Sequence, residues 1–379
     1  MRNQTKLERV AFVHCWLLHG GAREVLVDLI TWIDFVHGRI YTLLSDETSV
    51  CVGNKRLDVI TVLPSWFSQL LFFFQKQRLP LLSWLFDYRN LMPLYPLLVR
   101  ILSWKIQKFE ADLCMISSFA VAKNIEVKNC RTILYLHSPM QYIHSHYDEL
   151  VQNLGWVKWL LFRAIASRLK RWDMRERHYD QLFANSSFTA KLAKNIYGLE
   201  CGVLYPAIAP LFWSHHFCVK TLDYFVYVGR LSNPIREVDH IVRLFNELGQ
   251  KLIIIGEGPD SKNLKKMASA HILFVWWIDD VQTKISIMSQ SRWLINITQE
   301  SFGLITAESL LLWVPVFGYA WWATLELVDD QSGLLTKSKE HEALVSSFKD
   351  FNVKSFDRQH IQARARKLFS SNFSLTLSS

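Results

Sequence analysis

Residues 224–259 read YFVYVGRLSNPIREVDHIVRLFNELGQKLIIIGEGP, and this stretch decides the fold. Two short apolar runs, 224–228 and 251–255, flank a segment at 238–248 whose apolar residues recur with the period of a helix. A strand, a helix and a second strand of these lengths are typical of a βαβ unit, in which the two strands are parallel. Glycine follows each apolar run and permits a sharp turn at the strand end.

The same alternation extends over most of the chain in two series. Strand-like runs of the first series lie at 9–14, 58–62, 112–116, 132–136 and 181–184, and those of the second continue at 272–275, 293–297 and 314–317. Helix-period segments such as 24–33 and 305–312 lie between them. Two such series predict an α/β protein with two Rossmann-like domains. Two prolines bracket the predicted boundary, so we expect domains at 1–205 and 206–355 and a terminal helix within 356–379 that returns to the first domain.

Composition narrows the classes of partner and compartment. The chain has 379 residues, of which 20% are charged, as in ordinary globular proteins. Its six Cys are scattered without a C-x-x-C pair, which argues against a structural zinc site or a disulfide scaffold and favours a reducing cytoplasm. The net charge of +9 suits phosphate-rich ligands or an anionic membrane surface. Nucleic acid is not expected as a partner, because no block of five Lys or Arg and no zinc-finger pattern occurs.

Membrane contact is predicted to be peripheral at most. The N-terminus lacks the apolar core of a signal peptide. The most apolar region, 63–104, is interrupted by charged residues and prolines, so it contains no uninterrupted span of ~18 apolar residues. Buried helices are the main interpretation of this region. A helical surface that contacts lipid at the inner face of the cell membrane is the alternative, because aromatic and basic residues are interspersed there.

Two loops that follow predicted strands carry groups suited to phosphate. The first strand leads to Gly20 and Gly21 and then to a helix, which opens backbone N–H groups at a helix N-terminus. A tight turn is the competing interpretation, because the spacing of a dinucleotide fingerprint is absent. After the strand at 224–228, Arg230 and Arg236 supply two guanidinium groups that suit a diphosphate. A solvated basic turn is the alternative for the arginines.

Two glutamates bracket the start of a predicted helix in the second half. Glu300 precedes Phe302, Gly303 and Leu304, and Glu308 lies about two turns into the helix. The helix N-terminus offers free N–H groups to an anion, and the carboxylates accept hydrogen bonds from sugar hydroxyls. Because open α/β sheets bind ligands at the carboxyl ends of their strands, we expect these residues to share a site.

The C-terminal half resembles the retaining glycosyltransferases of family 4, which have the GT-B fold of two Rossmann-like domains facing across a cleft. The resemblance rests on VGRL, IIIGEGP, ESFGLITAES, PVFGY and TLELVDDQSGLL, in the family's order and spacing. The N-terminal half resembles one branch of that family through VHCWLLHGGA, LYLHSPMQYIHSHYDE, RWD and FANSSFTAKLAKNIYG. This branch is similar to bacterial mannosyltransferase-like enzymes of polysaccharide assembly. The resemblance covers nearly the whole chain.

The resemblance implies a role for each candidate residue. Arg230 and Arg236 hold the donor diphosphate, with Arg236 standing where the family usually has Lys. Glu300 approaches the donor sugar, Glu308 binds the nucleotide ribose, and His137 faces the donor sugar and the acceptor. The implied catalytic residues are therefore His137, Arg230 and Glu300, and the implied substrate-binding residues are Gly20, Gly21, Arg236, Phe302, Gly303, Leu304 and Glu308.

The implied reaction moves a sugar from a nucleoside diphosphate sugar to a saccharide or lipid-linked saccharide, with retention at the anomeric carbon. Mannose is the sugar in the resembled branch. No cofactor and no metal are expected, because the family needs none. A catalytically inactive GT-B module that binds a sugar or a protein partner is the main alternative. A GT-B sugar-nucleotide epimerase is a third, disfavoured because the two glutamates together with GRL fit transferases.

Tryptophan is unusually frequent relative to glycine. The chain has 15 Trp and 14 Gly, whereas an ordinary chain of this length carries roughly 27 Gly. Trp276, Trp313, Trp321 and Trp322 stand where the resembled family has glycine or a glycine-bearing loop. One interpretation is that these loops are rebuilt and the donor site is blocked. The other is that UGA codons specify glycine at these positions, as they do in some bacterial lineages.

Overall fold

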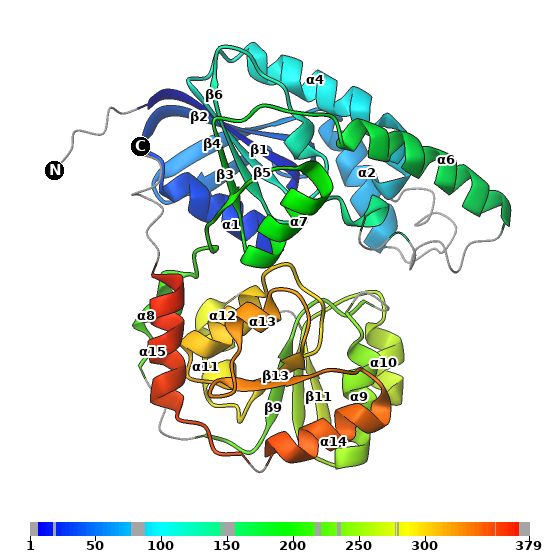
Figure 1. Cartoon of the computed structure of the whole chain (residues 1–379), viewed down its shortest axis with the longest axis vertical. Helices are drawn as coiled ribbons and strands as arrows, with labels where there is room; N and C mark the ends of the chain where they lie inside the picture. Colours follow the sequence, from blue (N-terminus) through cyan, green and yellow to red (C-terminus); the bar gives the residue numbers. More distant parts are fainter. Residues whose placement is uncertain are drawn as a thin grey trace. The chain divides into compact units, whose positions relative to one another are not determined.

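The computed structural model describes residues 7–17, 20–76, 88–144, 147, 156–216, 221–232, 236–276, 278, 280–352 and 354–370. The chain divides into two compact units, which meet in the sequence between Leu204 and Tyr205. This break lies one residue from the boundary expected from the prolines. Each unit contains a mostly parallel sheet with helices on both faces (Figure 1).

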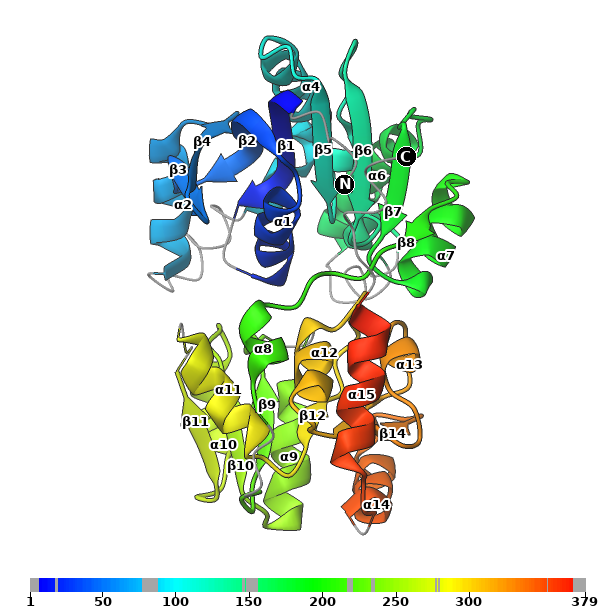
Figure 2. The same ribbon diagram turned by 90° about the vertical axis from the view of Figure 1, so that its left-hand side faces the viewer.

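The first unit is built on an eight-stranded sheet in the order β3-β4-β2-β1-β5-β6-β7-β8 (Figure 2). All its strand pairs are parallel except β3 with β4. The chain order reverses between β1 and β5, which makes their carboxyl ends the switch point of the sheet. The strands are β1 (Leu7–Leu17), β2 (Phe35–Ser45), β3 (Ser49–Val52), β4 (Lys55–Thr61), β5 (Leu113–Ser118), β6 (Arg131–Leu136), β7 (Gln181–Ala184) and β8 (Gly202–Val203).

Helices cover the first sheet on both faces. Alternate residues of a strand point to opposite faces, and Ala11, Val13 and Cys15 of β1 pack in one core with Leu98 and Leu169. These two leucines belong to α4 and α6, which Figures 1 and 2 show opposite α1. The helical segments are α1 (Gly21–Thr31), α2 (Ser65–Lys76), η1 (Tyr88–Leu94), α4 (Tyr95–Gln107), η2 (Ala122–Asn124), η3 (Gln141–Ile143), α6 (Trp156–Asp173) and α7 (Ser187–Tyr197).

The second unit has a six-stranded sheet, all parallel, in the order β11-β10-β9-β12-β13-β14. The βαβ unit expected at 224–255 is present as β9 (Phe225–Val228), α9 (Val238–Leu248) and β10 (Leu252–Ile255). Phe225 pairs with Leu252 and Val228 with Ile255, which confirms the parallel register. The other strands are β11 (Ile272–Val275), β12 (Leu294–Asn296), β13 (Val316–Tyr319) and β14 (Gly333–Thr336).

Successive residues of β9 enter two separate cores. Phe225 and Tyr227 pack under α9, α10 and α14, whereas Val226 and Val228 pack under α8, α11, α12 and α15. Burial on both faces explains why the strands of this sheet read as continuous apolar runs rather than as alternating ones. The remaining helices are α8 (Pro210–Ser214), α10 (Ser261–Met267), α11 (Val281–Ser289), α12 (Leu304–Leu311), α13 (Thr324–Leu327), α14 (His341–Asn352) and α15 (Arg358–Phe369).

The structure differs from the expectation at the C-terminal helix. The described part of that helix, α15, packs in the second unit rather than returning to the first domain. Ile361, Ala365 and Phe369 lie on one face of α15 and enter the core that α12 shares. Their spacing of about one helical turn makes a narrow apolar stripe, which the neighbouring α12 buries. Residues 371–379 lie outside the described residues.

Four strands were not predicted from the sequence, namely β2, β3, β8 and β14. In β2, the polar residues His37 and Arg39 and the intervening Gly38 interrupt the apolar pattern near its start. Pairing with β1 on one side and β4 on the other makes this segment a central strand. The short strand β14 is set in the same way by pairing with β13. Long-range pairing, which local pattern does not report, decides both β2 and β14.

None of the helices in the described part of the chain combines the length and apolarity that a membrane span requires. Much of the apolar region predicted at 63–104 forms α2, η1 and α4. Tyr95, Leu98, Leu102 and Ile106 of α4 are buried in the first core, as the main interpretation of that region expects. Residues 77–87 lie outside the described residues.

Candidate active site

The switch point of the second sheet lies between β9 and β12, because the chain order reverses there. Strand β9 leads directly to Gly229 and Arg230, and β12 leads to Thr298 and Glu300. The two strands are neighbours in the sheet. The residues selected from the sequence in the second half therefore gather at one sheet edge, where open α/β sheets bind ligands.

The loop after β9 is held by backbone contacts with the loop after β10. Leu231 N–H donates to the carbonyl of Glu257 at 2.8 Å, and Gly229 N–H donates to that of Ile255 at 3.0 Å. A side chain at Gly256 would place its Cβ only 1.9 Å from the carbonyl oxygen of Gly229, so only glycine permits this approach. The two loops thereby fix the backbone of Arg230, whose side chain is exposed to solvent.

Arg236 and Glu300 form an ion pair between the guanidinium Nη1 and the carboxylate Oε1. Burial disfavours the charged guanidinium, but the Glu300 carboxylate outweighs burial and raises the pKa of Arg236. The other carboxylate oxygen, Oε2, accepts from Asn296 Nδ2 at 3.2 Å. Thr298 Oγ1 donates to the Arg236 carbonyl at 3.3 Å. The structure thus joins two residues that the sequence assigned separately to diphosphate and sugar.

The N-terminus of α12 opens at the same edge. Gly303 caps this helix with φ of 92°, a conformation that disfavours side chains. A Cβ at this position would also lie 3.4 Å from Glu300 Oε2. Leu304 is the first residue of the helix, and its neighbouring N–H groups are those that an anion would meet. Phe302 is buried against Tyr205 and Phe369, so only its backbone is available to a ligand.

Glu308 lies within α12 and is paired with a lysine that the sequence analysis did not select. Lys284 Nζ of α11 lies 2.6 Å from Glu308 Oε2, and the two side chains are 16% and 8% exposed. Lys284 also lies over the ring of Phe212, 5.3 Å from its centroid. The carboxylate assigned to ribose is therefore held by a fixed cation. Local sequence carries no signal for Lys284, because the pair joins two separate helices, α11 and α12.

The switch point of the first sheet carries a chain of neutral polar groups. Contacts join His14 of β1, Ser117 of β5 and His137 after β6. His14 Nδ1 lies 3.0 Å from Ser117 Oγ, and Ser117 Oγ lies 2.8 Å from His137 Nε2. Burial lowers the pKa of His14 to about 4. Burial, followed by the neighbouring His14, lowers the pKa of His137 to about 3. Both imidazoles are consequently neutral near pH 7.

Gly20 and Gly21 begin α1 after β1. Gly20 precedes the helix with φ of 152°, and its carbonyl accepts from the N–H groups of Arg23 and Glu24. Open space surrounds the position of a Cβ at Gly20. Arg23 is bound by both oxygens of Glu47 at 2.9 Å, so its charge is already neutralised. The glycine pair leaves its backbone accessible at this helix start.

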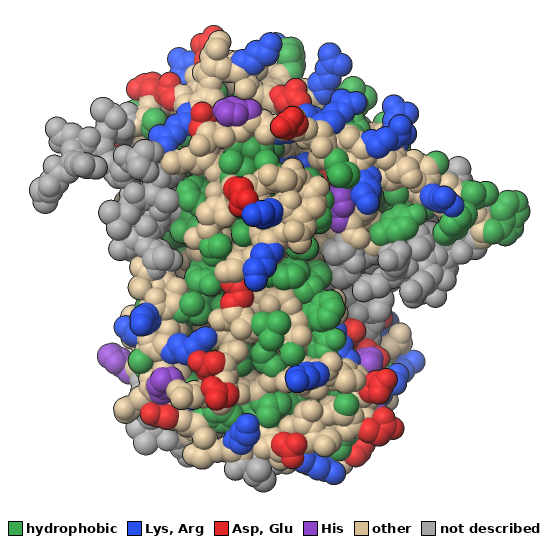
Figure 3. All heavy atoms as spheres, in the orientation of Figure 1, with side chains coloured by type: hydrophobic (Ala, Val, Ile, Leu, Met, Phe, Trp, Pro, Cys, Tyr) green, Lys and Arg blue, Asp and Glu red, His purple; other side chains and the backbone are tan. Residues whose placement is uncertain are grey.

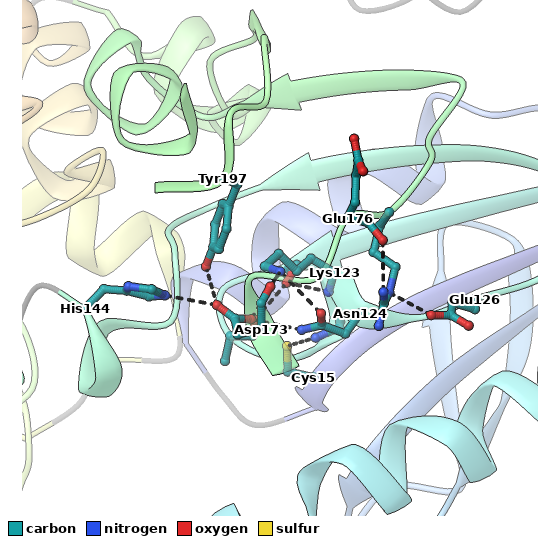
Figure 4. A network of polar contacts seen from close by, with 12 residues as sticks. Cys15, Lys123, Asn124, Glu126, His144, Asp173, Glu176 and Tyr197 are labelled. Atoms are coloured by element: carbon teal, nitrogen blue, oxygen red, sulfur yellow. Dashed lines mark hydrogen bonds and ion pairs between the residues drawn. The ribbon is translucent and has the colours of Figure 1, made fainter. Parts of the chain in front are cut away.

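A buried polar network below this edge centres on Asp173, at the end of α6 (Figure 4). Its carboxylate is fully buried and accepts from Tyr197 at 2.7 Å, Asn124 at 2.9 Å and His144 at 3.0 Å. Lys123 Nζ lies 3.2 Å from Asp173 Oδ1. Burial favours the neutral acid, but the bonds to its neighbours, led by His144, outweigh burial and lower the pKa of Asp173.

This Asp173 network ties the segment after β6 to α6, α7 and η2. His144 ends the segment that begins at His137, and Tyr197 belongs to α7. Lys123 and Asn124 belong to η2, whose Ala122 N–H donates to Cys15 Sγ at 3.3 Å. Asp173 belongs to the RWD motif, but the sequence alone indicates no role for it. A charged residue in an otherwise apolar helix face is the signal that could have identified it.

Comparison with solved structures identifies the fold. HepE of Anabaena, in complex with UDP and glucose, matches with a TM-score of 0.60 and 15% identity, covering 96% of this chain and 95% of that one. WaaG, a glycosyltransferase involved in lipopolysaccharide biosynthesis, matches with a TM-score of 0.62 and 14% identity over 97% of both chains. Sucrose-phosphate synthase of Thermosynechococcus elongatus matches with a TM-score of 0.68 and 13% identity, covering 98% and 97%. No curated protein sequence matches the chain.

The family comparison concerns the second unit. Residues 216–368 match the family described as glycosyl transferases group 1. This range contains both strands of the switch point and the residues from Arg230 to Glu308. The chain therefore has the GT-B fold, its second unit matches the glycosyl transferases group 1 family, and a glycosyltransferase is the class of enzyme that these matches support.

Proposed function

We propose that the chain transfers a sugar from a nucleoside diphosphate sugar to a saccharide or lipid-linked saccharide, with retention at the anomeric carbon. The observation that carries this proposal is the convergence of Arg230, Arg236, Glu300 and the α12 N-terminus at one switch point. Two guanidiniums and a helix N-terminus suit a diphosphate, whose oxygens accept several charge-assisted hydrogen bonds.

The charge distribution suits a departing diphosphate. As the bond from the anomeric carbon to the phosphate oxygen breaks, negative charge grows on the leaving group. Fixed cations and the N–H groups of α12 stabilise that charge more in the transition state than in the ground state. The acceptor oxygen then bonds to the same face of the sugar, and its proton passes to the departing phosphate. We assign no nucleophilic role to Glu300, because both of its oxygens are engaged by Arg236 and Asn296.

The donor proposal is tested with a panel of nucleotide sugars. HepE was solved with UDP-glucose and the resembled branch is mannosyltransferase-like, so the panel contains UDP-glucose and GDP-mannose. We propose mannose as the transferred sugar and expect turnover of GDP-mannose, undiminished by EDTA because no metal is assigned. NMR of the product gives the anomeric configuration, and inversion would contradict the proposal. Binding of nucleotide without turnover of any donor and acceptor pair would instead assign an inactive GT-B module.

The acceptor proposal rests on the surface of the first unit. Trp156 and Leu160 of α6 are 76% and 50% exposed, and Trp66 of α2 is 63% exposed. Figure 3 shows hydrophobic side chains at the outer end of α6 with Lys or Arg beside them. Exposed aromatic residues next to cations suit the interface of an anionic membrane. We therefore propose peripheral contact with the inner membrane face, where a lipid-linked acceptor is presented.

Vesicle binding tests this surface. The full chain should sediment with vesicles that contain phosphatidylglycerol and less with pure phosphatidylcholine. Trp156→Ser should reduce sedimentation, whereas Trp293→Phe, which changes a buried aromatic, should not. Equal sedimentation of Trp156→Ser and the parent would remove α6 from the membrane contact, without affecting the donor proposal.

A further inference from the structure

Two tryptophans occupy backbone conformations that belong to glycine. Trp313 has φ of 61° and Trp322 has φ of 50°, both in the left-handed region. A bulky side chain there brings its Cβ too close to the backbone, so such residues are genuine outliers. The other described residues with positive φ are glycines and three residues with polar side chains, namely Glu110, Asn129 and Glu237.

Trp313 stands at the glycine position of a helix C-terminal motif. Val314 N–H donates to the Ser309 carbonyl at 3.0 Å, and Trp313 N–H donates to the Leu310 carbonyl at 3.2 Å. These two bonds define the Schellman motif, whose left-handed residue is usually glycine. The chain itself supplies the comparison, because α7 and α9 end at Gly198 and Gly249 with φ of 70° and 65°. Of these three helix ends, only that of α12 has an indole at the left-handed position.

Trp322 lies in the turn between β13 and α13. Leu325 N–H donates to its carbonyl at 3.3 Å, which starts the short helix. Because β13 is the neighbour of β12, this turn lies at the edge that carries Glu300. Trp313, in contrast, precedes β13 and lies at the opposite sheet edge. Functional strain at a ligand site can therefore not explain both outliers.

We propose that residues 313 and 322 are glycine in the native protein, specified by UGA codons that the source cell reads as glycine. The chain has 14 Gly, about half of the roughly 27 expected of this length, so a deficit of glycine accompanies the two outliers. Among the tryptophans that stand at expected glycine positions, Trp313 and Trp322 have the left-handed backbone that supports a native glycine. Trp276 and Trp321 are not in the left-handed region and carry no inference here.

Some tryptophans are genuine, and they serve as internal controls. Trp293 is 5% exposed and packs within an aromatic core, with its ring centroid 4.2 Å from that of Phe351. Trp16 is 4% exposed and packs against Tyr95 at 5.8 Å. Neither residue has a positive φ, and replacing either ring with hydrogen would leave a large cavity. Trp313 is also buried, at 7% exposed, so the left-handed backbone, and not burial, distinguishes it from these two. We therefore assign UGG codons to Trp16 and Trp293.

The gene and the native protein decide the proposal, independently of any activity. We expect UGA at codons 313 and 322 and UGG at codons 16 and 293. Mass spectrometry of peptides from the source organism that span residues 304–336 should show glycine at both positions. UGG codons, or tryptophan in the native peptide, at both positions would overturn the proposal. Glycine at one position would keep it for that residue and overturn it for the other.

Stability gives a second readout in recombinant protein. The Tm of Trp313→Gly should be about 2–4 °C above that of Trp313→Ala, because the left-handed backbone is unfavourable for alanine but not for glycine. The same order is expected for Trp322→Gly against Trp322→Ala. The control Trp293→Gly should lower Tm. A Trp313→Ala variant as stable as Trp313→Gly would show that position 313 does not require glycine and would contradict the inference there.

Discussion

The two switch points of this chain carry different kinds of polar group, neutral in the first sheet and charged in the second. At the first, His14, Ser117 and His137 form a neutral chain whose histidine pKa values are lowered by burial. At the second, charges are present but paired, with Arg236 on Glu300 and Lys284 on Glu308. Both sheets have the same α/β architecture, so the strand-end residues, rather than the fold, set the chemistry of each edge.

This difference in charge indicates which of the two switch points can bind a charged ligand. A neutral imidazole chain can exchange hydrogen bonds with sugar hydroxyls but offers no fixed charge to a diphosphate. In the second unit the exposed Arg230 supplies that charge, together with the N–H groups at the α12 N-terminus. The first unit does contain a buried ion pair, Lys123 with Asp173, but it lies in the Asp173 network rather than at an open edge. It joins η2 to the end of α6 inside the unit.

The largest expected effect on the free energy of unfolding comes from a variant that breaks the buried pair of Lys123 and Asp173. Asp173→Asn keeps the size of the side chain but leaves the Lys123 ammonium without its counter-charge. Removing one partner of a buried ion pair costs about 3–5 kcal/mol, and urea unfolding should show this loss in the free energy of unfolding. Glu126→Gln is the matched control, because Glu126 is 66% exposed in its pair with Arg177 and should change stability by less than about 1 kcal/mol. Equal losses in the two variants would remove the distinction between the Asp173 network and a surface pair.

The next largest effect is a pH dependence of stability, which tests whether the histidines of the first switch point are neutral. Since the folded pKa values of His14 and His137 are about 4 and 3, and the unfolded value is about 6.5, the unfolded state binds more protons below pH 6.5. Stability is therefore fully present above about pH 6.5 and falls as the pH decreases, by about 2 kcal/mol for each histidine at pH 5. Urea unfolding at pH 7.5 and pH 5 measures the loss.

A variant assigns that loss to the histidine chain. His137→Gln should lower the pH dependence of stability, because glutamine does not titrate. If the parent and His137→Gln lose equal stability between pH 7.5 and pH 5, the first edge is not the neutral site described here.

The third effect concerns donor turnover at the second switch point. Arg230→Ala should raise the donor KM and lower kcat, because the guanidinium meets charge that grows on the leaving diphosphate. A lost charge-assisted contact of about 1.5–3 kcal/mol corresponds to a loss in kcat/KM of about ten- to hundredfold. Arg243→Ala on α9, where Arg243 is 60% exposed, should leave kinetics unchanged. Wild-type kinetics in Arg230→Ala would exclude Arg230 from the donor site.

The smallest effect separates the two carboxylates of the second edge. Glu308→Ala should weaken binding of the bare nucleoside diphosphate about tenfold, since ribose hydroxyls lose an acceptor worth about 1–1.5 kcal/mol. Glu300→Ala should affect turnover of the full donor more than binding of the bare nucleotide. Calorimetry with UDP and GDP measures binding, and Glu342→Gln on the exposed face of α14 is the control. Equal weakening in the two site variants would contradict the division of roles.

Much of the second unit could be predicted from the sequence. The βαβ unit at 224–255 has strong local signals, because buried parallel strands read as apolar runs and α9 has a clear helical period. The first unit was harder to predict, since β2 mixes polar and apolar residues and becomes a strand only by pairing with β1 and β4. Helix α15 packs in the second unit, and its apolar stripe by itself does not specify which surface buries it.

The sequence by itself determined the alternation of strands and helices, the position of the break and the residue types at the strand ends. Those features depend on neighbours in the chain, where local pattern carries the information. Only the tertiary structure decided the partners: Glu300 with Arg236, Glu308 with Lys284, and Asp173 with Lys123. Each pair joins separate elements, so its charges meet only after the sheet order is set, and pKa and accessibility follow from that meeting.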